Sequence, residues 1–380
     1  MRPHVPISSK AGLNRPINAS CVLGNIASYA INVSSAEDVA AGLRFAKQKN
    51  IRLSIKNTGH DFLGRLCWSG VAGTLDPQLK AISFRNYTSP QYKGPAIKLG
   101  AGVQAFEAYA AADKQGLRVT GGFCPTVGLA GGYVQGAGHG PLEGKYGLAA
   151  DNTLEFEVVT GDGKYLVASP TKNSDLFWAL NGGGGGTFAV VLSQTTRAHR
   201  DGIVAGAMAK VTVEAGQCPG SNTFWGVTDK IFTLYSGTLP DANASAIASL
   251  LDPFVQRLVE LQLPHTYETN DSPTYYEHFS RYTPASRTRH GPCRGHAFRI
   301  NGIASNVSHA RVGNKPGRNS VNPAWRDALY WLNMDVYFDP TRLDVIGALQ
   351  AQMNVNEGLF KALTPGGALS AFIDHLGYCP

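Results

Sequence analysis

Glycine constrains this chain more than any other residue type, because it gathers in two short segments. Of 44 glycines, eight lie within residues 121–140, and five stand consecutively from Gly182 to Gly186. A backbone without Cβ atoms can pass close to another segment or to a bound group. Patterns typical of helices or strands adjoin both segments, which argues against flexible linkers. We therefore expect both segments to lie against a ligand.

The first half of the chain predicts alternating short strands and helices. Ser34 and Glu37 fit a capping box for a helix that reaches about residue 50. The strand after this helix delivers Asn57-Thr-Gly-His-Asp61 to its C-terminal end, where α/β folds usually bind ligands. The remaining patterns predict strands at 29–33, 51–55, 96–99, 117–120 and 187–196, a hairpin at 154–160 and 164–168, and helices at 102–115 and 174–180.

Beyond residue 200 glycine becomes sparse, so we place a domain boundary near residues 199–203. The later patterns predict helices at 224–237, 244–262 and 341–362 and a strand at 329–338.

Two residues in the glycine-rich region are candidates for covalent chemistry. His60 lies on tight, polar backbone, where it could be a cofactor attachment point, a structural histidine or a metal ligand. Cys124 lies inside the glycine-rich loop, where it could be a reactive thiol or a small buried apolar residue. His290-x-x-Cys293-x-x-His296 lacks a supporting ligand pair, so we interpret it as a polar loop and expect no metal site.

A nicotinamide site is an alternative, because Leu99-Gly-Ala-Gly-Val-Gln-Ala105 matches G-x-G-x-x-A between a predicted strand and helix. The acidic ribose ligand expected about 20 residues later is missing, since residues 118–128 hold no Asp or Glu. The sequence therefore disfavours a nicotinamide site.

Composition excludes several other classes. The net charge is +7, but no run of Lys or Arg forms a nucleic-acid-binding stripe. No apolar stretch approaches the roughly 20 residues that a membrane helix needs. The six cysteines form no CxxC pair and no dense disulfide framework, and residues 1–10 lack the apolar core of a signal peptide, so the compartment stays open.

Taken together, the motifs resemble the berberine bridge enzyme-like FAD-linked oxidases of the vanillyl-alcohol oxidase and p-cresol methylhydroxylase superfamily, in particular the fungal members found in secondary metabolism. The matching blocks are Lys56–Arg65, Gly121–Gly140, Tyr146–Asn152 and Asp175–Val191. The resemblance implies an α+β fold. An FAD-binding domain of the p-cresol methylhydroxylase type would span residues 1–201, as two subdomains split near 92–95. A substrate-binding domain at 202–380 would follow, with an antiparallel sheet covered by helices. The C-terminal segment that returns to the flavin in this family is expected to be missing.

The resemblance also implies FAD as a covalently bound cofactor. His60 would carry an 8α-histidyl bond and Cys124 a 6-S-cysteinyl bond. Val127 falls where the family controls access of oxygen, and its small side chain implies dioxygen as electron acceptor. The other positions that usually line FAD in the family are Asn57, Thr58, Gly59, Asp61, Gly121, Gly122, Gly128, Gly131, Gly132, Gly138, His139, Gly140, Tyr146, Asp151 and Val158. We expect the segments around residues 60, 124 and 184 to form a slot for the flat ring and its diphosphate.

The implied function is oxidation of a small molecule, an alkaloid or polyketide, by hydride transfer to flavin N5, with dioxygen as acceptor and the protein as a monomer. A base must take a proton from the substrate. Along the predicted strand, Asp335 and Tyr337 share a polar and aromatic face, and they are our candidates. A plain solvated strand face is the alternative there. The alternative functions are a truncated or degenerate flavin-binding protein without activity, and an NAD-dependent dehydrogenase.

Overall fold

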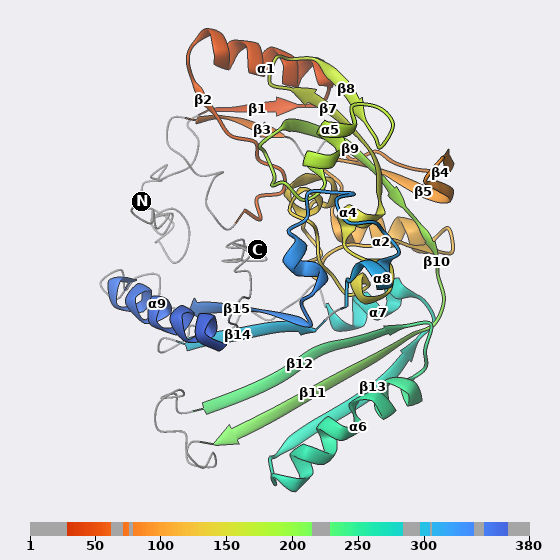
Figure 1. Ribbon diagram of the computed structural model, residues 1–380, viewed down its shortest axis with the longest axis vertical. Helices are drawn as coiled ribbons and strands as arrows, with labels where there is room; N and C mark the ends of the chain where they lie inside the picture. The colour runs from red at the N-terminus through yellow and green to blue at the C-terminus, as the bar shows by residue number, and fades with distance from the viewer. Residues whose placement is uncertain are drawn as a thin grey trace, which may run out of the picture. The chain divides into compact units, whose positions relative to one another are not determined.

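The computed structural model describes residues 29–61, 71–75, 79–214, 229–283, 297–304, 306–337 and 346–363 (Figure 1). By their contacts, the described residues fall into two compact units. Unit 1 draws on residues 1–108, 120–198 and 290–380, and unit 2 on residues 109–119 and 199–289. The described residues from 297 onward thus group with the first part of the chain. The functional division into 1–201 and 202–380 stays a prediction.

Unit 1 begins with a small parallel sheet. Its strands lie in the order β1-β3-β2, and β3 pairs in parallel with both neighbours. The elements are β1 (Tyr29–Val33), α1 (Ala36–Gln48), β2 (Arg52–Leu53) and β3 (Val71–Leu75). The capping box of α1 is formed by Ser35 and Asp38, one residue later than predicted. Asp38 is the residue whose carboxylate also accepts hydrogen bonds from the backbone and side chain of Ser34.

A five-stranded antiparallel sheet forms the core of unit 1, in the order β4-β5-β9-β7-β8. Its central strand β9 is buried along almost its whole length. Phe177 and Val134 pack with Phe156 of this sheet in an apolar cluster. The strands are β4 (Ile82–Ser89), β5 (Tyr92–Gly100), β7 (Thr153–Thr160), β8 (Tyr165–Ala168) and β9 (Ala189–Arg197). The helical elements are the π-helical turn η2 (Leu129–Tyr133), α3 (Glu143–Tyr146), α4 (Ala149–Asn152) and α5 (Ser174–Leu180), while α2 (Ala105–Asp113) begins in unit 1 and ends in unit 2.

The topology around β5 removes the basis for a nicotinamide site. A Rossmann site needs two parallel strands joined by a helix. β5 instead pairs antiparallel with both β4 and β9. Gly100 has a structural reason of its own, because a Cβ at this position would overlap the carbonyl of Leu79. The G-x-G-x-x-A match at residues 99–105 therefore reflects chain packing.

Unit 2 is built on the antiparallel sheet β12-β11-β13. Ile247 of α6 packs on Ala205 and Ala207, whereas the ring of Tyr282 from α7 lies over Gly206. Because strand side chains alternate between faces, the two helices cover opposite faces of the sheet. The elements are β6 (Leu117–Arg118), β10 (His199–Arg200), β11 (Val204–Glu214), β12 (Asp229–Pro240), α6 (Ala244–Glu260), β13 (His265–Ser272) and α7 (Tyr275–Tyr282). The helix predicted at 224–237 is wrong, because residues 229–237 belong to β12.

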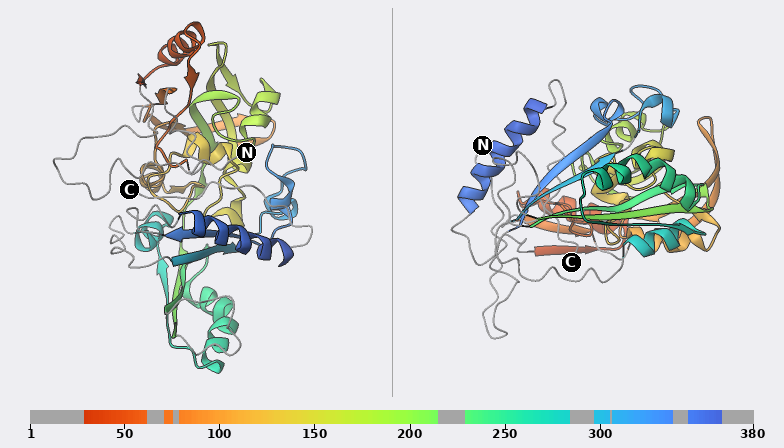
Figure 2. Two further views of the ribbon diagram at one scale, coloured as in Figure 1. Left: turned by 90° about the vertical axis from the view of Figure 1, so that its left-hand side faces the viewer. Right: turned by 90° about the horizontal axis from the view of Figure 1, so that it is seen from below.

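The C-terminal part of unit 1 holds the antiparallel pair β14 (Ala297–Ala304) and β15 (Tyr330–Tyr337). Between these strands lie α8 (His309–Val312) and the 3-10 turn η3 (Pro323–Arg326), and α9 (Ile346–Leu363) follows them. Figure 2 shows α9 alongside the strand pair. The strand predicted at 329–338 and the helix predicted at 341–362 are confirmed within the described residues. No helix of the described part is long and apolar enough to cross a membrane.

The buried His278 of unit 2 predicts a pH dependence of stability. Its Nε2 lies 2.9 Å from Thr238 Oγ1, and burial, with nearby Arg281, lowers the pKa of His278 to about 4. A histidine in the unfolded chain has a pKa of about 6.5, so the unfolded chain takes up the proton first as the pH falls. The stability contributed by neutral His278 is therefore complete above that pH and is lost as the pH falls toward 4.

Urea unfolding measured between about pH 6.5 and pH 4 should show the free energy of unfolding of the wild-type chain fall by about 3 kcal/mol from this group. A His278→Gln variant should lack this decline. Equal slopes for the two proteins would contradict this assignment.

Candidate functional site

Three side chains of the 54–61 segment make hydrogen bonds here, two of them with the glycine-rich loop of residues 121–140. Asn57 Nδ2 donates a 2.6 Å hydrogen bond to the carbonyl of Ala101, beside the loop. Thr58 Oγ1 accepts a 3.1 Å bond from the backbone N–H of Gly128. His60 Nε2 lies 2.8 Å from Thr126 Oγ1. Residues near 60 and 124 are therefore joined directly.

Glycine is required where the 54–61 segment meets the glycine-rich loop, because the two backbones approach closely. At Gly131, a Cβ would lie 2.6 Å from Asn57 Nδ2, and at Gly128 it would overlap Asn57 Oδ1. The five-glycine segment reaches the same loop, because a Cβ at Gly185 would lie 2.8 Å from the Cα of Gly132. The backbone N–H of Gly184 also donates a 2.8 Å bond to the carbonyl of Gln135. The three segments therefore meet as predicted, while the slot for the ring and its diphosphate stays a prediction.

Several polar groups where these three segments meet have no hydrogen-bond partner among the described residues. Within the described residues, the backbone N–H groups of residues 57–60 donate no hydrogen bond. Gly59 has a φ of +98°, a conformation that glycine tolerates. Asn57 Oδ1 is buried, with no hydrogen-bond partner in the described part of the chain. Successive N–H groups suit the oxygens of a diphosphate, and a buried unpaired acceptor suits a ligand hydroxyl, so these residues fit FAD.

His60 has the electrostatic state that a nucleophile requires. Partial burial lowers its pKa below the usual value, against the opposing effect of the hydrogen bond with Thr126. The imidazole is therefore neutral at pH 7. Nε2 is occupied by Thr126, while Nδ1 makes no hydrogen bond within the described residues. Nδ1 is thus the nitrogen that can form a bond to a ligand.

Cys124 differs from the prediction. Its Sγ lies 3.7 Å from Thr126 Oγ1, so the one hydroxyl contacts both candidate attachment residues. In this structure Cys124 is disulfide-bonded, and all five other cysteines lie outside the described residues. A sulfur in a disulfide has no valence left for flavin. Attachment through Cys124 would therefore first require reduction of this bond.

Two other predicted residues are engaged by the protein itself. The carboxylate of Asp151 is buried and accepts hydrogen bonds from Arg326, Asn314 and Asn319, so these bonds occupy its side chain. Val158 is fully buried in the core of the five-stranded sheet. Contacts of either residue with FAD, if formed, would have to come from the backbone.

The remaining predicted positions lie on or beside the same loops. Gly121, Gly122 and Gly140 are buried where the two ends of the loop meet, and a Cβ at Gly140 would overlap the carbonyl of Gly121. Gly138 takes a φ of +73°, and the ring of His139 stacks at 14° on that of Trp325, with centroids 6.3 Å apart. The half-buried positions are Asp61, Val127 and Tyr146, and Gly132 is exposed.

The predicted base residues lie on the strand where the sequence placed them. In backbone register, Asp335 faces Arg299 and Tyr337 faces Ala297. The side chains of Asp335 and Tyr337 lie outside the described part of the structure, so their role stays a prediction. Sequence reasoning missed Thr126 as the residue between His60 and Cys124, although it stands in the same motif. No described group of three His, Cys, Asp or Glu gathers as metal ligands would.

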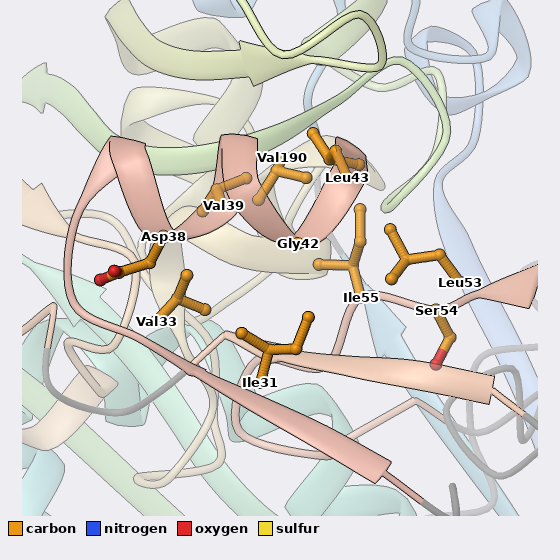
Figure 3. A pocket seen from close by; sticks show the side chains of 10 residues that line it. All are labelled: Ile31, Val33, Asp38, Val39, Gly42, Leu43, Leu53, Ser54, Ile55 and Val190. Atoms are coloured by element: carbon orange, nitrogen blue, oxygen red, sulfur yellow. The ribbon is translucent and has the colours of Figure 1, made fainter. Parts of the chain in front are cut away.

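A small apolar pocket lies next to residues 53–55, at the start of the 54–61 segment (Figure 3). Its volume is about 40 Å³, and it is lined by side chains of α1, β1, β9 and residues 53–55. Ser54 Oγ faces this region and is buried with no partner among the described residues. That volume admits only a few water molecules, so the pocket is no ring-binding site.

Comparison with known proteins places these observations in a family. The family described as an FAD binding domain matches residues 27–169. The VAO-type flavoprotein oxidase VAO615 of Thermothelomyces thermophilus is 49% identical over 282 residues, which are 69% of this chain and 49% of that protein. The chain thus spans about half the length of this curated relative.

Solved structures agree with this relationship. The crystal structure of the VAO-type flavoprotein MtVAO615 from Myceliophthora thermophila C1 superposes with a TM-score of 0.77 at 36% identity, covering 92% of this chain and 72% of that one. A glucooligosaccharide oxidase from Acremonium strictum, described with a 6-S-cysteinyl, 8α-N1-histidyl FAD, superposes with a TM-score of 0.56 at 19% identity, covering 75% and 62%. The second likeness bears on the fold alone.

Proposed function

The chain belongs to the VAO-type FAD-linked oxidoreductases, and on that premise we propose that it is an oxidase that binds FAD covalently and oxidises a small organic molecule. One observation carries the proposal: neutral His60 lies beside Thr126 and Cys124, next to the unbonded N–H groups of residues 57–60 and the buried acceptor of Asn57. These groups match the ring, diphosphate and hydroxyls of FAD in one continuous place.

Individual residues have separate tasks in this proposal. The backbone of residues 57–60 would hold the diphosphate, and Asn57 would orient the cofactor through its free oxygen. His60 would be bonded to the flavin at C8α, and Cys124, once reduced, at C6. Two bonds at different ring positions would fix the ring and raise its potential. The Acremonium strictum oxidase, which shares the fold, is described with an FAD that carries both kinds of bond.

Bound FAD would supply a hydride acceptor at N5, with electrons passing on to dioxygen. Val127 is half-buried three residues after Cys124, and its small side chain would leave dioxygen a path to the ring. Asp335 or Tyr337 on β15 would accept a proton from an O–H or N–H of the substrate as hydride leaves its carbon. By the resemblance to fungal oxidases of secondary metabolism, the substrate would be an alkaloid or a polyketide.

The proposal is tested on the purified chain without knowledge of the substrate. We expect a visible flavin spectrum and an intact mass raised by one FAD. After chemical reduction of the flavin without oxygen, admission of air should restore the oxidised spectrum and release an equimolar amount of hydrogen peroxide. Slow reoxidation without peroxide would point to a flavin-binding protein that is not an oxidase. Protein without flavin would refute the proposal.

A further inference from the structure

The connection between β14 and β15 is long for two paired antiparallel strands. It runs from Ala304 to Tyr330, although the strands pair over their full length. Paired antiparallel strands can be joined by a turn of about two to five residues, so this connection, which holds α8 and η3, is far longer than the pairing needs. In Figure 1 the part with α8 extends away from the strand pair, and α8 packs against α3. We call residues 306–327 the cross-connection.

The cross-connection ends in a buried ion pair with Asp151. Arg326 approaches both carboxylate oxygens of Asp151, each at 2.8 Å, and the exposed fractions of the two side chains are 5% and 1%. Asn314 and Asn319 donate to Asp151 Oδ1 at 2.6 and 2.9 Å, and the backbone N–H of Leu148 donates to Oδ2 at 3.0 Å. Every acceptor position of this buried carboxylate thus faces a donor, most of them from the cross-connection.

A second set of contacts reaches the five-glycine segment. The backbone N–H of Ser320 donates to the carbonyl of Asn181 at 3.0 Å, and Trp178 Nε1 donates to the carbonyl of Gly317 at 2.9 Å. At Gly182 a Cβ would lie 2.8 Å from the Cα of Val321, so the two backbones touch.

Contacts with the 138–151 loop complete the arrangement. The ring of Trp325 stacks on His139, and a Cβ at Gly147 would lie 2.7 Å from a methyl group of Val312. Both glycine-rich segments that reach the candidate flavin site are therefore held by the cross-connection. The contacts that hold them are separate from those of Asn57, His60 and Cys124 described above.

We propose that the cross-connection positions the cofactor loops and that Asp151 and Arg326 are positioning residues for the flavin, an inference that rests on the proposed flavin function. Without the bidentate arginine, the buried carboxylate keeps Asn314, Asn319 and the backbone N–H of Leu148 as donors but loses the countercharge of Arg326, so the chain around Asp151 must rearrange to solvate it. The loops would then shift away from the geometry that holds the ring.

The test measures flavin per folded protein and the visible circular dichroism of bound flavin, which reports ring orientation. We expect Arg326→Met to reduce retained flavin about tenfold and to change the dichroism, because at least one charged hydrogen bond is lost. Arg326→Lys keeps the charge without the bidentate geometry and should restore part of both signals. Asn314→Ala combined with Asn319→Ala retains the ion pair, so it should fold and show a smaller change of the same kind.

Arg118 supplies the matched control. It is 2% exposed and pairs with Asp201 and Asp241, and all three residues belong to unit 2, whereas the glycine-rich segments belong to unit 1. Arg118→Met should lower the midpoint of unfolding while the flavin dichroism of folded protein stays the same. The inference would be overturned if the Arg326 and Asn314/Asn319 variants kept wild-type flavin content and dichroism. It would also be overturned if Arg118→Met changed both signals as much as Arg326→Met does. Either result would leave the proposed function standing. Wild-type protein without flavin would overturn the proposed function together with the inference.

Discussion

Acid-precipitated protein is expected to lose its yellow flavin colour completely when His60 and Cys124 are both replaced by alanine. Acid unfolds the chain and releases every cofactor that is not covalently bound. When Nε2–H of a neutral His60 donates to Thr126 Oγ1, the lone pair lies on Nδ1, which is then the attacking nitrogen, so attachment at C8α needs this residue. We expect His60→Ala alone to retain acid-stable flavin only to the extent that Cys124 is free of its disulfide.

The disulfide gives this experiment a second variable. Cys124 can form either a disulfide or a bond to flavin in any one molecule, but not both. Expression under reducing conditions should therefore increase the acid-stable flavin of the His60→Ala variant. Intact mass spectrometry checks each protein, because each bound FAD adds a known mass. Acid-stable flavin in the double variant would show that a different residue carries the bond.

Variants of Thr126 test whether its hydroxyl orients the His60 imidazole for attachment to flavin. Thr126→Val removes the hydroxyl that contacts both His60 and Cys124, whereas Thr126→Ser retains it. A lost hydrogen bond of about 1.4 kcal/mol corresponds to about tenfold slower attachment in the valine variant. The serine variant should attach flavin at the wild-type rate. Equal rates for valine and serine would mean that Thr126 does not orient the imidazole.

Local patterns predicted the first half of the fold well, because each element there carries its own signal. The helix at 174–180 and the hairpin about residues 161–163 lie where periodicity and turn residues put them. The capping box moved by one residue because Ser34, Ser35, Glu37 and Asp38 offer two overlapping patterns, and the sequence does not rank them.

The failures arise where distant packing decides the outcome. Residues 229–237 have apolar spacing compatible with a helix, but Ile231, Phe232 and Thr233 are β-branched or aromatic, and pairing with β11 makes the segment a strand. Glycine clustering revealed that three segments meet, whereas nothing near Arg326 indicates a partner 175 residues away. Ion pairs between remote positions have no local sequence pattern.

The glycine at position 131 should tolerate no side chain, even one as small as alanine. A Cβ there would lie 2.6 Å from Asn57 Nδ2, 2.9 Å from Asn57 Cγ and 3.1 Å from Asn57 Cβ. The amide cannot simply rotate away, because Nδ2 donates to the carbonyl of Ala101 at 2.6 Å. Gly131→Ala must therefore displace Asn57 and the turn that follows it. Overpacking of about 1–3 kcal/mol and a lost hydrogen bond of about 1 kcal/mol should lower the free energy of unfolding by about 2–4 kcal/mol.

Flavin binding should fall further than stability does in this variant, because Asn57 begins the segment whose N–H groups face the diphosphate. Titration of unfolding with denaturant and the flavin content of the folded protein measure the two effects separately. Gly144→Ala is the matched control, since a Cβ at this position in α3 meets nothing within 4 Å. Alanine in a helix is favoured over glycine by about 1 kcal/mol, so the control should be at least as stable as wild type. If Gly131→Ala kept its flavin and its stability, the close approach of the two segments would not be what positions Asn57.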